Sequence, residues 1–214
     1  MNRSRAITGR RPRRRLVAAW CACLALFVAS CAGRTANADE TTAPPQPAVV
    51  LVNLDDAAAV QAWTTVNDPV MGGRSTSQVT FGDPGLVFSG ILSLENNGGF
   101  ASARGPNDPG IGQRAAGATS LLIRARGDGK TYVLKVGAPG QPWSYIQRFA
   151  TEAGVQRVYA LPVGGFQPVG MRLDPAPDAP QTLDPSTISQ VAVYILDKQE
   201  GPFDIAITGI DAAV

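Results

Sequence analysis

Apolar residues recur at every second position in five separate segments of this chain. The five alternating sets are Leu86, Phe88, Gly90, Leu92 and Leu94; Tyr132, Leu134 and Val136; Trp143, Tyr145, Gln147 and Phe149; Val191, Val193 and Ile195; and Phe203, Ile205 and Ile207. This period is typical of a β-strand that buries one face, because successive side chains of a strand point to opposite sides. The pattern therefore predicts a fold built mainly from strands.

The rest of the chain beyond residue 48 fits the same kind of fold. Further strands are expected at 49–54, 76–81, 99–104, 119–126 and 155–161. Turn-forming clusters of Gly, Pro, Asp and Asn separate the strands. The one helix that we expect is short, over 55–62, with Asp55 as its N-cap. About ten short strands and so little helix predict an all-β fold, an antiparallel β-sandwich or jelly roll, in one domain over 49–214.

The first 30 residues have the two parts of an export signal. Seven arginines, all within residues 3–15, precede an apolar run of 14 residues, Leu16 to Ala29. A membrane-spanning helix needs roughly 20 apolar residues, so this run is too short to serve comfortably as one. A basic region followed by a short apolar core is typical of a secretory signal. We therefore interpret residues 1–30 as a signal peptide.

Two cleavage sites compete at the end of this signal. Val28-Ala29-Ser30-Cys31 resembles the bacterial lipoprotein processing box, whereas Ala36-Asn37-Ala38 resembles an ordinary signal-peptidase site. We favour lipidation at Cys31, because this residue lies almost at the edge of the apolar core. Residues 31–48, which are small, polar and rich in proline, would then be a flexible tether. This interpretation predicts an exported lipoprotein, anchored to a membrane of the cell envelope on its periplasmic or extracellular face.

Charge argues against a nucleic-acid partner. Residues 1–30 hold seven of the 19 basic residues and none of the 17 acidic ones. From Cys31 onward the chain therefore has 12 basic and 17 acidic residues, a formal charge of −5. An acidic domain without a basic run lacks the electrostatic footprint that nucleic-acid binding requires.

Residue types also limit the available chemistry. The chain contains no histidine, which excludes Ser-His-Asp and Cys-His catalysis and every metal site that needs an imidazole. Its three cysteines, Cys21, Cys23 and Cys31, all belong to the signal or its edge. Four acids that we expect at strand ends or in loops could form a carboxylate pair, but a structural role is favoured for each: Asp68, Glu95, Asp128 and Asp197. Prolines spoil a regular calcium-ligand spacing among Asp174, Asp178 and Asp184. We therefore predict no enzyme activity, no metal and no cofactor.

Several ordered sequence blocks resemble one known family. Residues 63–75 read Trp-Thr-Thr-Val-Asn-Asp-Pro-Val-Met-Gly-Gly-Arg-Ser, and residues 94–104 read Leu-Glu-Asn-Asn-Gly-Gly-Phe-Ala-Ser-Ala-Arg. Phe88-Ser89-Gly90 lies between them, and blocks at 126–132, 143–145 and 198–203 follow in order. Together, over about residues 51–211, they are similar to the complex I intermediate-associated protein 30 family.

The resemblance implies a galactose-binding-domain-like jelly roll, in agreement with the strand pattern. Mitochondrial members of that family are assembly factors for respiratory complex I and act by protein contact. The resemblance therefore favours a non-catalytic binding module that works through protein–protein contact. A carbohydrate- or cell-wall-binding lipoprotein is the alternative, since this fold class also hosts such modules.

The residues that carry the resemblance are Trp63, Asn67, Asp68, Met71, Gly72, Gly73, Ser75, Asn97, Gly98, Gly99 and Arg104. We expect the paired glycines and Asn97 to provide positive φ and close approach of strand ends at tight turns. We expect Trp63 to plug the core or to cover one end of the sandwich. We expect Asp68 and Arg104 to form a buried or half-buried ion pair that fixes the two motif loops.

Trp143 and Tyr145 are the residues best suited to a ligand platform. They would lie on one strand face, next to the loop over 137–142, with Gln147, Arg148 and Asn97 nearby. Two such rings could stack on a sugar or on a partner's side chain. The alternative is that both rings face the core.

Overall fold

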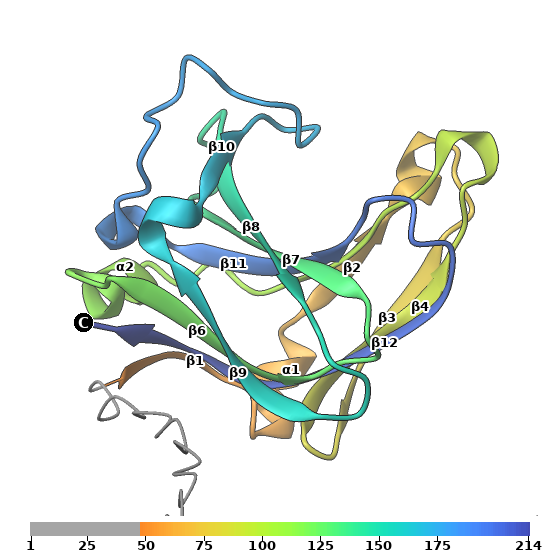
Figure 1. Ribbon diagram of the computed structural model, residues 1–214, viewed down its shortest axis with the longest axis horizontal. Helices are drawn as coiled ribbons and strands as arrows, with labels where there is room; N and C mark the ends of the chain where they lie inside the picture. Colours follow the sequence, from red (N-terminus) through yellow and green to blue (C-terminus); the bar gives the residue numbers. More distant parts are fainter. Residues whose placement is uncertain (1–47) are drawn as a thin grey trace, which may run out of the picture. The chain divides into compact units, whose positions relative to one another are not determined.

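Residues 48–214 are described by the computed structural model, in which two antiparallel sheets face each other (Figure 1). The elements are β1 (Ala48–Asn53), α1 (Ala57–Gln61), β2 (Thr64–Asn67), η1 (Asp68–Met71), β3 (Thr76–Gly82), β4 (Gly85–Leu92), η2 (Glu95–Asn97), β5 (Ala101–Arg104), α2 (Gly110–Ala115), β6 (Ser120–Arg126), β7 (Thr131–Gly137), β8 (Ser144–Ala150), β9 (Gln156–Pro162), η3 (Val163–Gly165), β10 (Gln167–Val169), η4 (Pro185–Thr187), β11 (Gln190–Ile195) and β12 (Gly201–Ala213). The predicted all-β sandwich is thus confirmed.

Sheet A has the order β3-β4-β12-β6-β9, and β1 also pairs with β12. The long strand β12 can hold three neighbours because its two halves pair differently. Its first half, up to Ile207, lies against β4, and its second half, from Gly209, lies against β1. Between Ile207 and Gly209 the register with β6 also shifts, and such a bulge bends a strand. The bend lets one strand run along the whole sheet.

Sheet B has the order β10-β8-β7-β11-β5-β2. Its register defines two ends, which matter for the site. At one end Asn67 is paired with Ala101, and Ala101 with Ile195. At the other end Gln190 is paired with Gly137. The loops next to Asn67, Ala101 and Ile195 therefore lie at one end of sheet B, and those next to Gly137 and Gln190 lie at the other.

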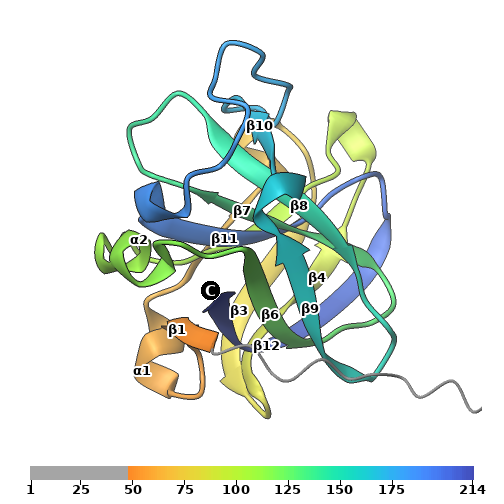
Figure 2. The ribbon, with the colours of Figure 1, turned by 60° about the vertical axis from the view of Figure 1, so that its left-hand side comes forward.

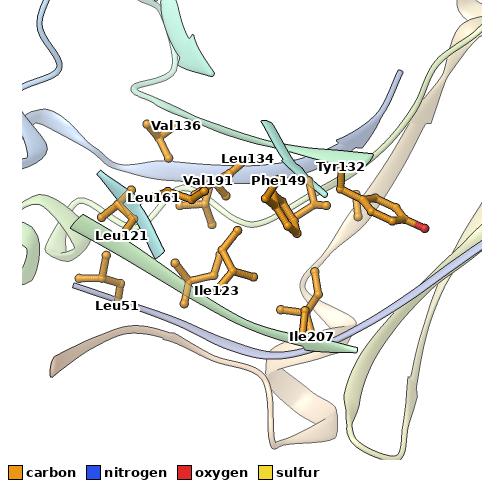
Figure 3. Close-up of a cluster of buried hydrophobic side chains, with 14 of the residues drawn as sticks. Leu51, Leu121, Ile123, Tyr132, Leu134, Val136, Phe149, Leu161, Val191 and Ile207 are labelled. Carbon is orange, nitrogen blue, oxygen red and sulfur yellow. The ribbon is translucent and has the colours of Figure 1, made fainter. Parts of the chain in front are cut away.

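The main core lies between the sheets, where the alternating residues of the sequence meet (Figure 3). Ile123 and Ile207 of sheet A face Leu134, Phe149 and Val191 of sheet B, and all five are buried. Burying an aliphatic or aromatic side chain of this size contributes about 1.5–3 kcal/mol. Interdigitation of the two inner faces therefore drives the sandwich to form.

Sheet B carries a second, smaller apolar cluster on its outer face. The cluster contains Val133, Ile146, Val169, Ala192, Tyr194 and Leu196, with Phe100 and Leu173 packed against it. Figure 1 shows that the outer face is flanked by the 170–184 segment on one side and by the η1 and η2 turns on the other. The outer face of sheet B is thus partly enclosed.

Most of the strand predictions agree with the structure, and the exceptions are short elements. The helix is over 57–61 and its N-cap is Asp56, whose carboxylate accepts a hydrogen bond from Ala58 N; the expected start at Asp55 is wrong. Strands β2 and β10 and helix α2 were not expected. Helix α2 lies beside the segment that carries η4 (Figure 2), and Gly112 touches the backbone of Ser186 there.

The predicted signal, the lipidation at Cys31 and the tether all fall outside the described residues, apart from Ala48, which begins β1. Within 48–214, no helix combines the length and the hydropathy that crossing a membrane demands.

Candidate functional site

Asp68 organises the loops that contain the family-like motif. Its side chain is buried and accepts four hydrogen bonds: from Ser75 N (2.8 Å), Ser75 Oγ (2.6 Å), Gly99 N (2.6 Å) and Phe100 N (3.3 Å). Burial alone would raise the pKa of Asp68, but the hydrogen bonds, led by that of the Ser75 hydroxyl, hold the pKa below its ordinary value. We call this arrangement the Asp68 clamp. It ties the loop after β2 to the turn before β5.

The glycines of the motif fit around the clamp. Gly72 and Gly99 have positive φ, 92° and 124°, as expected for residues at tight turns. A Cβ on Gly73 or Gly98 would lie 2.5 Å or 2.6 Å from the Asp68 carboxylate. The predicted close approach is therefore real, but it is an approach of backbone to the Asp68 carboxylate and not of two strand ends.

The other motif residues divide between the core, the sheet and the loop tip. Trp63 is buried in the main core, as predicted. The Asn67 side chain hydrogen-bonds the Ser77 hydroxyl at 2.6 Å, and Asn97 has a positive φ of 60°. At the tip of η1, Val70 and Met71 are 72% and 62% exposed. The clamp thus holds two apolar side chains out in solvent.

The predicted ion pair between Asp68 and Arg104 is wrong. Arg104 pairs with Thr64 at one end of the β2–β5 ladder, whereas Asp68 follows Asn67 at the other end. Arg104 instead donates from Nε to Ser102 Oγ at 3.2 Å, and its guanidinium carbon lies 5.6 Å from the centroid of the Tyr194 ring. Arg104 therefore belongs to the outer face of sheet B.

Trp143 and Tyr145 do not form a platform of two open rings. Trp143 precedes β8 and is half-buried against the core, and Tyr145 is buried, with its hydroxyl donating to Pro180 O at 2.9 Å. Asn97 lies at the other end of sheet B and does not join them. Trp143 nevertheless borders a cavity, so a ligand contact through this ring stays a prediction.

We call this hollow the Trp143 cavity; its volume is about 370 Å³. Its walls include Gln141, Trp143, Tyr145, Thr182, Asp184 and Thr187. Asp184 is the N-cap of η4: its Oδ1 accepts from both the hydroxyl and the N–H of Ser186. These bonds lower the pKa of Asp184, so the carboxylate is ionised at neutral pH. Its Oδ2 accepts no hydrogen bond from any described residue. The cavity therefore offers an aromatic ring, a free carboxylate oxygen, an amide and hydroxyls.

A second, smaller hollow lies on the outer face of sheet B. Its volume is about 50 Å³, and Arg104, Lys135, Ser144, Gln190, Ala192 and Tyr194 line it. We call it the Arg104–Lys135 cleft. It shares Gly137 and Ala138 as lining residues with the Trp143 cavity. The sequence did not single out Lys135, Gln190 or Tyr194. The alternation of side chains along a strand predicts that these residues face outward. Whether they lie next to one another depends on the order of the strands in the sheet, which the sequence does not state.

The other three acids considered for a carboxylate pair have structural partners. Glu95 pairs with Arg74 at 3.2 Å, Asp197 pairs with Arg148 at 2.7 Å, and Asp128 accepts hydrogen bonds from Lys130 N and Asp204 N. Burial, followed by the charge of Asp128, raises the pKa of Asp204. Neither Asp128 nor Asp204 lines either of the two hollows. Within residues 48–214, no three His, Cys, Asp or Glu side chains are grouped as a metal site would require.

The two facing sheets place this chain among the antiparallel β-sandwiches of jelly-roll type. Residues 52–207 match the family described as complex I intermediate-associated protein 30, so the chain belongs to that family. A search among curated protein sequences gave no significant match.

Solved structures with a similar fold are distant in sequence. The family 11 carbohydrate-binding module of a cellulosomal cellulase from Clostridium thermocellum is similar with a TM-score of 0.54 and 14% identity, over 80% of this chain and 95% of that module. The same module in complex with a β-1,3-1,4-mixed-linked tetrasaccharide also gives 0.54 and 14%, over 79% and 96%. An agarase, AgWH50C, gives 0.51 and 14% over 79% of this chain but only 25% of the agarase. At this identity the likeness shows the fold alone.

Proposed function

We propose that this chain is a non-catalytic saccharide-binding module and that the Trp143 cavity holds one sugar ring. The observation that carries the proposal is the lining of this cavity. Its volume of about 370 Å³ falls within the range of ligand pockets, about 300–1,000 Å³, and an aromatic ring and several polar groups meet there.

Each part of the lining matches a part of a sugar. The C–H face of a pyranose is apolar and packs well on an indole ring such as that of Trp143. Sugar hydroxyls need both acceptors and donors. The free Oδ2 of Asp184 supplies an acceptor, and Gln141 and Thr182 supply both kinds of group. The fold of a module solved with a bound tetrasaccharide gives the proposal further support.

The test is binding of the full chain to a glycan array, followed by calorimetry on the glycans that bind. Trp143→Ala should reduce affinity at least tenfold, and Trp143→Phe should restore part of it. Asp184→Asn should also weaken binding but leave thermal stability nearly unchanged, because Asn caps a helix as well as Asp does. The matched control is Phe81→Ala: Phe81 is an aromatic residue that is 48% exposed on β3, outside the cavity, and its loss should leave affinity unchanged. Equal affinity of wild type and Asp184→Asn would refute the site.

Protein contact is the second candidate function, and the tip of η1 favours it. Val70 and Met71 are exposed there although the buried Asp68 clamp holds their loop in place. Exposed apolar side chains on a fixed loop suit a protein partner. Val70→Ser together with Met71→Ser should abolish capture of a protein partner from cell-envelope extracts and leave saccharide binding intact. Unchanged capture would exclude the tip.

We also propose that the module is exported and anchored by lipid on Cys31. The arginine-rich start, the apolar run and the cysteine at its edge support this. Metabolic labelling with a fatty-acid analogue should mark the wild type and not Cys31→Ser. A mature N-terminus at Asp39 would show cleavage after Ala38 and refute the lipid anchor.

A further inference from the structure

The Arg104–Lys135 cleft exists because a small residue separates two long cationic ones. Arg104, Ala192 and Lys135 are direct cross-strand neighbours on β5, β11 and β7, and all three face outward. Adjacent strands are about 4.8 Å apart, so the two cations flank a gap that the methyl group of Ala192 does not fill. Tyr194, on the same face of β11, forms one wall of the gap.

Among residues 48–214 the two cations have no acidic partner. None of the residues that line the cleft is acidic, and within residues 48–214 no carboxylate lies within 4 Å of either cation. Arg104 donates from Nε to Ser102 Oγ and also interacts with the Tyr194 hydroxyl, whereas Lys135 makes no hydrogen bond to a described side chain or backbone group.

This arrangement is unfavourable in the free protein. Burial, and then the charge of Arg104, lower the pKa of Lys135, which means that the folded state disfavours the charged amine. Both cations lie over the Tyr194 ring, at 5.6 Å and 5.8 Å from its centroid. Contact with the π face offsets part of the desolvation, but it neutralises no charge. An anion between the two side chains would remove the repulsion.

We propose that the Arg104–Lys135 cleft binds the carboxylate of a uronic acid, and hence that the module recognises an acidic polysaccharide. This inference rests on the proposed saccharide-binding function and assigns it a ligand class. The cleft volume of about 50 Å³ holds a group the size of a carboxylate but not a sugar ring. The planar guanidinium of Arg104 suits the two oxygens of a carboxylate, and Lys135 adds a second charge.

The position of the cleft links it to the Trp143 cavity. Gly137 and Ala138 line both hollows, so the two sites are separated only by the end of β7 and the start of its loop. One sugar unit on Trp143 would thus place a neighbouring unit of the same chain near Arg104 and Lys135. A chain that carries carboxylates satisfies both sites at once, whereas a neutral chain leaves the cations unpaired.

The experiment compares oligogalacturonate and oligoglucuronate with the same oligosaccharides after reduction of their carboxyl groups. Calorimetry with the full chain should show at least tenfold tighter binding of an acidic oligosaccharide than of its reduced form. Arg104→Gln combined with Lys135→Gln should bring this ratio below about twofold without weakening binding of the reduced form. Arg157→Gln is the matched control, since Arg157 is exposed on β9 of sheet A; it should leave the ratio unchanged.

The possible outcomes separate the two proposals. Equal binding of the acidic and reduced oligosaccharides would overturn the carboxylate inference and leave the saccharide-binding function intact. An absence of binding to every glycan would overturn both. Binding of an Asp- and Glu-rich peptide, sensitive to Arg104→Gln, with no binding of any oligosaccharide, would show that the cleft reads a protein carboxylate instead.

Discussion

Replacement of Asp68 by Asn tests the central element of the motif loops. The two side chains have the same shape, but an amide has one acceptor oxygen where the carboxylate has two. In the best orientation the amide oxygen takes the place of Oδ2 and keeps the bonds from Ser75 Oγ, Gly99 N and Phe100 N. The amide nitrogen then faces Ser75 N, so two donors meet in a buried site.

The expected cost follows from these contacts. One hydrogen bond to a charged group is lost, at about 1.5–3 kcal/mol, and the buried Ser75 N–H is left without an acceptor. The three remaining bonds also lose the charge that strengthens them. We therefore expect Asp68→Asn to lower the free energy of unfolding by about 3 kcal/mol at pH 7. For a domain of this size that corresponds to a fall in Tm of about 9 °C.

The effect should depend on pH with a definite sign. The pKa of Asp68 is lower in the folded state than in the unfolded state, where a free carboxyl titrates near about 3.9. The folded state therefore releases this proton more readily than the unfolded state. The contribution of Asp68 to the free energy of unfolding is fully present above the unfolded pKa. This contribution is lost as the pH falls through the folded pKa. The difference in free energy of unfolding between wild type and Asp68→Asn should therefore narrow below pH of about 4.

Urea unfolding of both proteins between pH 7 and the lowest pH at which the wild type folds would measure this gap. Ser75→Ala is a useful control, since it removes one donor of the clamp and should cost about 1–2 kcal/mol. A gap below about 1 kcal/mol at pH 7, or one that stays constant down to low pH, would refute the idea that an ionised Asp68 holds the loops.

Four further substitutions test other parts of the structure by urea or thermal unfolding at pH 7. Gly98→Ala should destabilise the fold by about 2 kcal/mol or more, since its Cβ would overlap the Asp68 carboxylate; a neutral effect would contradict the close approach. Lys135→Met should raise the free energy of unfolding by about 0.5–1 kcal/mol, because it removes a half-buried charge that no carboxylate of residues 48–214 neutralises. A lower free energy of unfolding would show instead that the Lys135 amine makes a stabilising contact with an acidic group. Asp56→Ala should cost about 1 kcal/mol and Asp55→Ala close to nothing, and the reverse order would restore Asp55 as the helix cap.

The sequence was sufficient for most strands and insufficient for β2 and β10. β7 and β11 alternate regularly, so their apolar residues predicted both their existence and their buried face. β2 consists of Thr-Thr-Val-Asn, with no apolar alternation, and it forms because it pairs with β5. β10 contains Pro168, which is typical of an edge strand and weakens any strand prediction. These two elements depend on neighbours that are distant in sequence.

Helix α2 shows the same limit. Its six residues, Gly110–Ala115, include two glycines, so local propensity argues against a helix. It forms because Ile111 and Ala115 are buried, and Gly112 lets the helix approach the Ser186 backbone so closely that a Cβ could not fit. Tertiary packing overrides propensity here, and the sequence offers only a weak local sign of a helix start in Asp108-Pro109, where Asp108 Oδ1 accepts from Gly110 N.

The error over Asp68 and Arg104 has a similar origin. Opposite charges in neighbouring motifs suggested an ion pair. The partners of Asp68 are mainly backbone N–H groups, and because nearly every residue has one, residue types do not reveal which of them bind Asp68. Strand register then separated the two residues along the β2–β5 ladder. The neighbours of Arg104 come from β7 and β11, and nothing in the local pattern states that these strands lie beside β5.

The motif that defines the family thus divides into two physical parts with different consequences. Asp68, Ser75 and the glycines around them satisfy one another inside the loops, so they fix the architecture and leave little surface chemistry. Of the residues that give the two hollows their character, Arg104 ends the 94–104 block and Trp143 lies in the 143–145 block, whereas Lys135 lies outside all of the blocks. The clamp does not involve Arg104 or Lys135, so the cleft can change without loss of the clamp. A chain with the clamp but with neutral residues in place of Arg104 and Lys135 should keep this fold and show no preference for acidic ligands.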